Sequence, residues 1–146
     1  MIIITGKAGS GKSTLLKKLR TNFNYNKPIT SRPKREGENN EEYRFFSDQD
    51  CESLANLTKD VFIVAKFNNW WYLVPKSSQL KILNPQQITE ELYQTHLIIY
   101  LDIPEEIRRE RLLARNDADS VERRMKADFK DFKDFKLYHL RITENG

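Results

Sequence analysis

The sequence predicts an α/β fold with a central parallel sheet. Two apolar runs, at 1–5 and 95–104, have the composition expected of parallel strands that are covered on both faces. The first run leads into a segment with three glycines in six positions and then into an amphipathic helix. This order of strand, glycine loop and helix predicts that the first run is a central strand.

Length and composition restrict the class of protein. The 146 residues fit one domain, so we expect a single domain over 1–146. The lone Cys51 excludes a disulfide framework and a cysteine-based zinc site. No apolar run approaches the roughly 20 residues that cross a bilayer, and the first apolar run is too short for a signal peptide. We therefore expect a cytoplasmic protein with no membrane partner.

The segments after the glycine loop can be assigned in chain order. In the first helix, Leu15, Leu16 and Leu19 share one face. The polar segment 27–46 contains two prolines and one glycine, which predicts an ordered loop region with short strands. The next expected elements are a short helix over 47–57 with Ser47 or Asp48 as N-cap, a strand over 61–67, a turn and short strand over 68–78, and a short strand with a two-turn helix over 81–93.

The last third of the chain has a mostly helical pattern. Helical spacing over 105–115 is interrupted at 116–120, and Asp119 with Glu122 forms a capping box for a further helix. A final strand is expected over 137–143. Four apolar residues of the second helix are expected to pack together in the core, namely Val121, Met125, Phe129 and Phe132.

The glycine loop matches a phosphate-binding motif. G-x-x-x-x-G-K-[ST] is satisfied at Gly6, Gly11, Lys12 and Ser13, between a strand and a helix as the motif requires. Backbone N–H groups of such a loop face the phosphates, Lys12 bridges the β- and γ-phosphates, and Ser13 ligates Mg²⁺. We therefore predict a P-loop NTPase fold of three layers, α/β/α, with ATP as co-substrate and Mg²⁺ as cofactor. The residues expected to bind ATP in this loop are Gly6, Ala8, Gly9, Ser10, Gly11, Lys12, Ser13 and Thr14.

A second basic segment suits a phosphate monoester. Arg32 and Arg35 stand three positions apart around a proline, and each guanidinium can donate to two phosphate oxygens. Tyr43 can add a hydroxyl donor. Residues 1–35 hold nine basic side chains and no acidic one, but the phosphate loop accounts for several of them. The charge therefore does not favour a nucleic-acid partner, for which Trp70 and Trp71 would be the stacking residues.

Three motifs resemble those of guanylate kinases. "TSRPKREGENNEEYRFFS" resembles their T-T-R-x-P-R-x-G-E and Y-x-F signature, "GKAGSGKSTLLKKL" their phosphate loop and first helix, and "RRERLLARNDADSVERRMKADF" their lid. The similarity runs in order along nearly the whole chain and weakens over 68–94. It implies transfer of the ATP γ-phosphate to GMP, dGMP or another (d)NMP. It also implies a small NMP-binding insertion over about 28–78 and a helical lid over about 108–126.

The resemblance also implies roles for individual residues. Arg32, Arg35 and Tyr43 would bind the phosphate of the acceptor nucleotide, with Trp71 on the acceptor side in place of a tyrosine. The lid would supply Arg115 and Arg124 as catalytic residues over the transferring phosphoryl group, together with Lys12. Arg111 and Asn145 would lie beside the adenine of ATP.

The chain departs from the family where the family recognises guanine. Ile63 or Val64 stands near the position of a base-reading glutamate, and Leu73 near that of a hydroxyl. An apolar pocket that depends on stacking predicts a broader or shifted base preference, unless Glu41 or Glu42 restores guanine recognition. A second strand of the family carries acidic residues, and this chain has Asn84 and Gln86 in their place. Mg²⁺ would therefore depend on Ser13, and Asp102 is the one acid that could still reach the site.

Two alternative functions follow from the same residues. A P-loop kinase of a different hydroxyl acceptor would need a general base, for which Glu38 and Glu42 are the candidates. A degenerate kinase-like module would bind a phosphopeptide through Arg32 and Arg35. The intact Lys12 and Ser13 favour the nucleotide kinase. Protein partners are not predicted.

Overall fold

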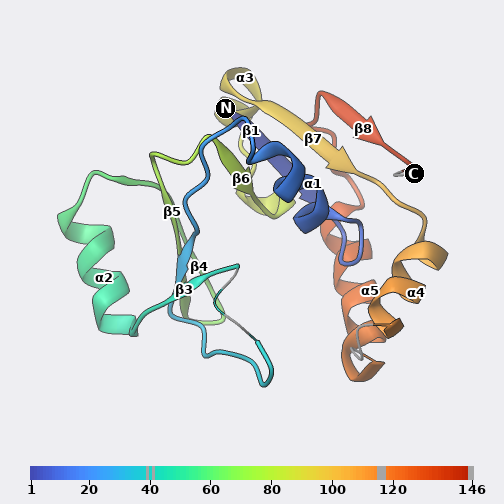
Figure 1. Ribbon diagram of the computed structural model, residues 1–146, viewed down its shortest axis with the longest axis horizontal. Coiled ribbons are helices and arrows are strands. Elements are labelled where there is room, and N and C mark those ends of the chain that lie inside the picture. Colours follow the sequence, from blue (N-terminus) through green and yellow to red (C-terminus); the bar gives the residue numbers. More distant parts are fainter. Residues whose placement is uncertain (39, 41, 115–117, 145–146) are drawn as a thin grey trace. The chain divides into compact units, whose positions relative to one another are not determined.

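The computed structural model describes residues 1–38, 40, 42–114 and 118–144, and it divides the chain into two compact units (Figure 1). Unit 1 comprises Met1–Asn22 and Leu80–Gly146, and unit 2 comprises Phe23–Gln79. Each unit has its own four-stranded sheet. Side chains are not described at 62–64, 67 and 118–120.

The sheet of unit 1 is parallel throughout and has the strand order β6-β1-β7-β8. Its strands are β1 (Ile2–Gly6), β6 (Leu80–Ile82), β7 (Leu97–Leu101) and β8 (Leu140–Ile142). Strand β1 pairs on both sides, with β6 and with β7, so it is central as predicted. Ile3, Ile4 and Ile98 have no exposed surface, which explains why these strands are continuous apolar runs.

Helices flank this sheet (Figure 1). They are α1 (Lys12–Leu19), α3 (Glu90–Thr95), α4 (Glu105–Ala114) and α5 (Ala118–Phe132), with a 3₁₀ turn η1 (Pro85–Gln87) before α3. The predicted strands and helices of unit 1 are therefore present. The short strand and the two-turn helix expected over 81–93 correspond to β6 and α3, with the 3₁₀ turn η1 between them and with α3 extending to Thr95.

Two expectations about α5 are wrong. The helix begins at Ala118, so Asp119 is already helical and is not the non-helical N-cap of a capping box. Val121, Met125 and Phe132 are buried, but Phe129 is 68% exposed. At about 100° per residue, Phe129 lies about 80° round the helix from Val121, whereas Met125 and Phe132 lie within about 40° of it. Phe129 therefore lies at the edge of the apolar stripe.

Unit 2 has a mixed sheet with the strand order β3-β2-β5-β4. Its elements are β2 (Ile29–Thr30), β3 (Arg44–Phe45), α2 (Asp48–Leu57), β4 (Val61–Phe67) and β5 (Trp70–Pro75). The Ser47 hydroxyl accepts the Asp50 N–H at 3.1 Å and caps α2, as predicted. The hairpin turns at Asn68 and Asn69, whose φ values of 53° and 66° belong to a tight turn that asparagine tolerates.

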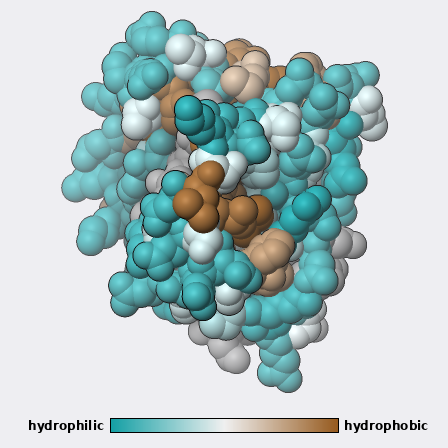
Figure 2. Space-filling view, turned by 90° about the vertical axis from the view of Figure 1, so that its left-hand side faces the viewer, coloured by the Kyte–Doolittle hydropathy of each residue, from teal (hydrophilic) through white to brown (hydrophobic). Residues whose placement is uncertain are grey.

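The surface seen in Figure 2 is mostly hydrophilic, with hydrophobic residues near its centre and along its upper edge. This agrees with the mean hydropathy of −0.71. Within the described ranges, no helix has both the length and the apolar character that a membrane span needs.

Burial of His96 makes the stability of the fold depend on pH. Desolvation lowers the pKa of His96 below its ordinary value of 6.5, and the positive charge of Lys81 lowers it further. As the pH falls through about 6.5, the unfolded chain binds a proton that the folded chain resists, so the free energy of unfolding decreases. We expect this free energy, measured by urea denaturation, to fall between pH 7.5 and pH 5.5. The fall should be smaller in His96→Gln, and an equal fall in both proteins would contradict the assignment.

Candidate functional site

The glycine loop between β1 and α1 has the backbone shape of a phosphate-binding loop. Gly9 and Gly11 adopt φ values of 77° and 94°, which only glycine adopts without strain. Gly11 is the N-cap of α1, and no described side chain caps the helix there. The first N–H groups of α1 are therefore left for a ligand, and the positive end of the helix dipole favours an anion.

Lys12 lies in the first turn of α1 and folds back over the loop. Its Nζ donates to the carbonyl oxygen of Gly6 at 2.5 Å and lies 3.3 Å from that of Lys7. These contacts hold a half-buried ammonium group beside the N–H donors of the loop. A phosphate bound to those donors would therefore lie within reach of the Lys12 charge.

Helix α4 packs tightly against the glycine loop at Gly9. A Cβ atom on Gly9 would come within 2.8 Å of the Arg108 carbonyl oxygen, so the loop and the helix touch backbone to backbone. Arg111 Nη1 donates to the Gly9 carbonyl oxygen at 3.0 Å. Arg111, expected beside adenine, thus lies against the phosphate loop in this structure.

A carboxylate on α5 also holds the loop. The Ala8 N–H donates to Asp128 Oδ2 at 2.8 Å, and the Ala8 side chain packs against Leu112, Val121 and Met125. Sequence analysis missed Asp128, because the two residues are 120 positions apart and no local motif joins them. Hydrogen bonds to a charged acceptor are stronger than neutral ones, so Asp128 fixes the outer part of the loop.

Removing this contact should weaken ATP binding. We expect Asp128→Ala to raise the dissociation constant for ATP about tenfold, because a hydrogen bond to a charged group is worth about 1.5–3 kcal/mol. Asp128→Asn keeps an acceptor oxygen and should restore most of the affinity. Isothermal titration measures both variants, with Asp131→Ala, an exposed acid one turn further along α5, as the control. Wild-type affinity in Asp128→Ala would contradict this role.

The donor set for a metal is small. Ser13 is exposed in the first turn of α1, and its hydroxyl oxygen is a ligand of the type Mg²⁺ prefers. The carboxylate of Asp102 is occupied by Arg141, whose Nε and Nη2 donate to Oδ2 at 2.9 and 2.8 Å. The part of the chain that the structure describes holds no cluster of three or more acidic, histidine or cysteine ligands. Ser13 therefore fits Mg²⁺ that is otherwise held by phosphates and water.

Unit 2 brings several of the predicted acceptor residues together. Arg32 is only 6% exposed, and its Nη1 and Nη2 donate to the two oxygens of Glu38 at 3.0 and 2.8 Å. The guanidinium also lies 5.5 Å from the ring centre of Tyr43 and 5.4 Å from that of Phe45. The hydrogen bond to Arg32 lowers the pKa of Glu38, so this carboxylate stays ionised and holds Arg32 in place. Arg35 is exposed in the same turn, and its N–H donates to Glu38 at 2.9 Å.

Tyr43 stays protonated and faces a second tyrosine. Burial raises the pKa of Tyr43 to about 12, so its hydroxyl is a donor at neutral pH. Its ring lies 6.2 Å from that of Tyr72 in an edge-on arrangement. Since successive side chains of a strand point to opposite faces, Trp71 is on the other face of β5 from Tyr72. Sequence analysis selected Trp71 as an acceptor-site residue and missed Tyr72. The centre of the Trp71 ring lies 4.9 Å from the Lys66 ammonium.

The structure does not describe every predicted site residue. Arg115, Asn145 and Glu41 lie outside the described residues, as do the side chains of Ile63 and Val64. Arg124 is half-buried on α5. Leu73 has no exposed surface and belongs to the core of unit 2.

Comparisons with known proteins agree with this geometry. A family model described as an AAA domain matches residues 2–130 of the chain. Guanylate kinase from Anaplasma phagocytophilum is a similar solved structure, with a TM-score of 0.69 and 18% sequence identity over 100% of this chain and 77% of that one. No curated protein matches the sequence. The structural likeness confirms the predicted P-loop NTPase α/β fold, here of guanylate-kinase type.

Proposed function

The chain belongs to the AAA domain family, and from this premise we propose that it is an ATP-dependent nucleoside monophosphate kinase of guanylate-kinase type. It would transfer the γ-phosphate of ATP to GMP, dGMP or another (d)NMP. The observation that carries the proposal is the glycine loop with Lys12 at its end, placed between a central parallel strand and a helix. The guanylate-kinase-like fold supports the same class of reaction.

The loop would position ATP and neutralise its charge. In the reaction, an oxygen of the acceptor phosphate forms a bond to the γ-phosphorus while the bond to the β,γ-bridging oxygen breaks, and ADP leaves. Such a transfer needs positioning and electrostatic stabilisation rather than covalent help. Lys12 would follow the charge that moves onto the β-phosphate. Arg124, together with Arg115, would balance the charge of the transferring group, and Mg²⁺ held by Ser13 would supply further positive charge.

Unit 2 would hold the acceptor phosphate. Arg35 is exposed in the same turn as Arg32. Glu38 would keep the Arg32 guanidinium fixed, so that little side-chain freedom is lost when the phosphate binds. The neutral Tyr43 hydroxyl would add a donor. Tyr72, whose ring lies 6.2 Å from that of Tyr43, is a further candidate for this site.

The base preference of the acceptor should differ from that of guanylate kinases. Leu73 is an apolar core residue where the family has a hydroxyl, and the sequence has Ile63 and Val64 near the expected glutamate. A site without a hydrogen-bonding partner for guanine rejects other bases weakly. We expect GMP and dGMP not to be uniquely favoured. The values of kcat/KM for the four common dNMPs with ATP and Mg²⁺ test this, and a preference for dGMP of about a thousandfold, or about 4 kcal/mol, would contradict it.

A further inference from the structure

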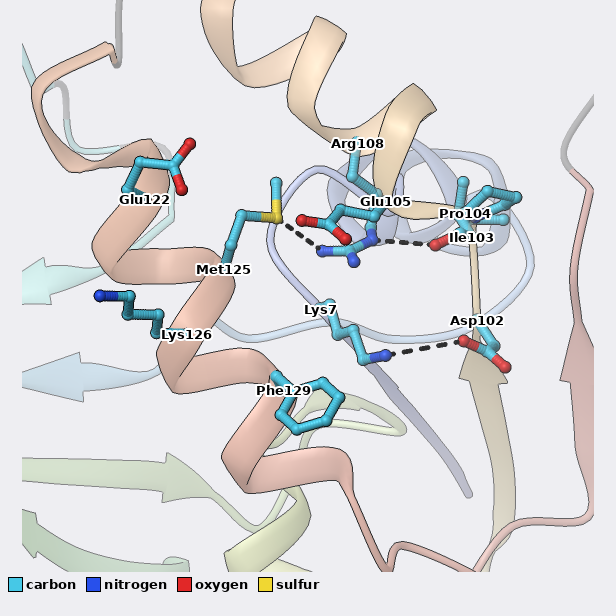
Figure 3. Close-up of a pocket in the computed structure, with 10 residues that line it drawn as sticks. All are labelled: Lys7, Asp102, Ile103, Pro104, Glu105, Arg108, Glu122, Met125, Lys126 and Phe129. Carbon is cyan, nitrogen blue, oxygen red and sulfur yellow. Dashed lines mark hydrogen bonds and ion pairs between the residues drawn. The ribbon is translucent and has the colours of Figure 1, made fainter.

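A cavity of about 440 Å³ in unit 1 lies beside the phosphate loop but outside its donor groups (Figure 3). Lys7 is the one loop residue that lines it, and Gly9–Thr14 do not. The other walls come from the end of β7, from α4 and from α5. We propose that this cavity is a second ligand site, which binds a phosphate monoester carried on an aromatic group. The proposal does not depend on the kinase activity.

The acidic residues of the cavity already have basic partners outside it. Asp102 accepts two hydrogen bonds from Arg141. Glu105 and Glu122 both form ion pairs with Arg109, the first at 2.9 Å. Two arginines that do not line the cavity therefore pair with its three carboxylates.

The basic residues of the cavity are less fully compensated than its acidic residues. Arg108 is 5% exposed, and among the described residues it forms no ion pair: its Nε donates to the Ile103 carbonyl oxygen at 2.9 Å and its Nη1 lies 3.5 Å from the Met125 sulfur. Lys7 forms an ion pair with Asp102 at 3.9 Å, and it shares this carboxylate with Arg141. Figure 3 shows the Lys7 ammonium directed toward Asp102 and the Arg108 guanidinium between Ile103 and Met125.

A buried guanidinium without a carboxylate is costly unless an anion binds it. The cavity is lined by three basic residues, counting Lys126, and three acidic ones, and Arg109 and Arg141 pair with those acids from outside, so five basic and three acidic groups leave an excess of two positive charges. This excess suits a phosphate monoester, which carries about −1.5 to −2 charges at pH 7. The charge balance therefore identifies the anionic half of the ligand.

The apolar wall identifies the other half. Met125 borders the cavity on α5, and Phe129 follows one turn later with 68% of its surface exposed. Phe129 is the large apolar residue of α5 that the core does not bury. A flat aromatic group could pack on its ring and on the Met125 thioether, which gains from contact with aromatic groups.

Methionine NMR offers a local test, because the chain has only two methionines. In protein labelled with ¹³C at the methionine methyl groups, phenyl phosphate should shift the Met125 signal saturably and leave Met1 unchanged. Phenol and inorganic phosphate should each bind more weakly than phenyl phosphate, because each lacks one half of the ligand. The proposal would be overturned if phenol or inorganic phosphate bound as tightly as phenyl phosphate, or if the Met125 signal did not shift.

Variants separate this cavity from the ATP loop. Lys7→Gln and Arg108→Gln should each weaken phenyl phosphate binding about tenfold, the usual weight of one charged contact. Lys130→Gln, on α5 but not lining the cavity, should have no effect. Lys12→Ala removes the loop ammonium and should leave the Met125 titration unchanged, whereas loss of that titration would place the ligand in the ATP site and overturn the proposal. If Arg108→Gln does not fold, Lys7→Gln decides.

Discussion

Lys12→Ala is expected to lower kcat by about 10²- to 10³-fold, the loss seen when one stabilising group of a transition state is removed. The Lys12 ammonium donates to the carbonyl oxygens of Gly6 and Lys7 and lies beside the backbone N–H donors at the start of α1. The loop itself is shaped by Gly9 and Gly11, so the fold should remain intact without the Lys12 side chain. Steady-state kinetics measure the effect, and the thermal midpoint checks the fold.

A neighbouring lysine provides the matched control for this variant. Lys18 is exposed on the same helix and has no contact with the loop among the described residues. Lys18→Ala should therefore keep wild-type turnover. Turnover near that of the wild type in Lys12→Ala would defeat the assignment of the glycine loop as the ATP site.

Arg35→Ala is expected to raise KM for the acceptor nucleotide by about 10- to 100-fold while KM for ATP changes little. A charged hydrogen bond contributes about 1.5–3 kcal/mol, and the two substrates are expected to use different units of the chain. The contact of this turn with Glu38 is made by the Arg35 backbone N–H and survives the substitution. The fold of the loop should therefore be preserved.

The adjacent Lys34 serves as the control for Arg35. Its ammonium lies 5.7 Å from the Phe45 ring, and it is exposed like Arg35, so Lys34→Ala removes a similar charge from the same turn. We expect it to leave KM for the acceptor nearly unchanged. If Arg35→Ala instead abolishes ATP binding and spares acceptor binding, the two sites are assigned in reverse.

Most of the fold could be predicted from local patterns. The apolar runs around Ile3 and Ile98 are continuous because both faces of these strands are buried, and this is visible in the sequence. The Ser47 cap and the Asn68–Asn69 turn are likewise local signals, since each depends on residues close together in the chain. The glycine loop was predicted for the same reason.

What escaped prediction depends on contacts between distant segments. Asp128 binds the N–H of Ala8 from 120 positions away. Tyr72 and Tyr43 approach each other because β3 and β5 both pair with β2, an order that the sequence does not specify. Phe129 is a large apolar residue of the kind that usually packs in a core, but its angle on the helix leaves it exposed. The pairing of Arg32 with Glu38 was also not predicted, because Arg32 was expected to bind the acceptor phosphate and Glu38 was a candidate general base.

The measurement that tests the central claim most directly is ³¹P NMR of the protein mixed with ATP, Mg²⁺ and one nucleoside monophosphate at a time. The spectra follow every phosphorus atom, so they distinguish phosphoryl transfer from hydrolysis and from binding alone. We predict that, with at least one acceptor, ADP and the nucleoside diphosphate appear in equal amounts with little inorganic phosphate. If the γ-phosphate of ATP is released only as inorganic phosphate, or ATP persists with every acceptor, the chain is not a nucleoside monophosphate kinase.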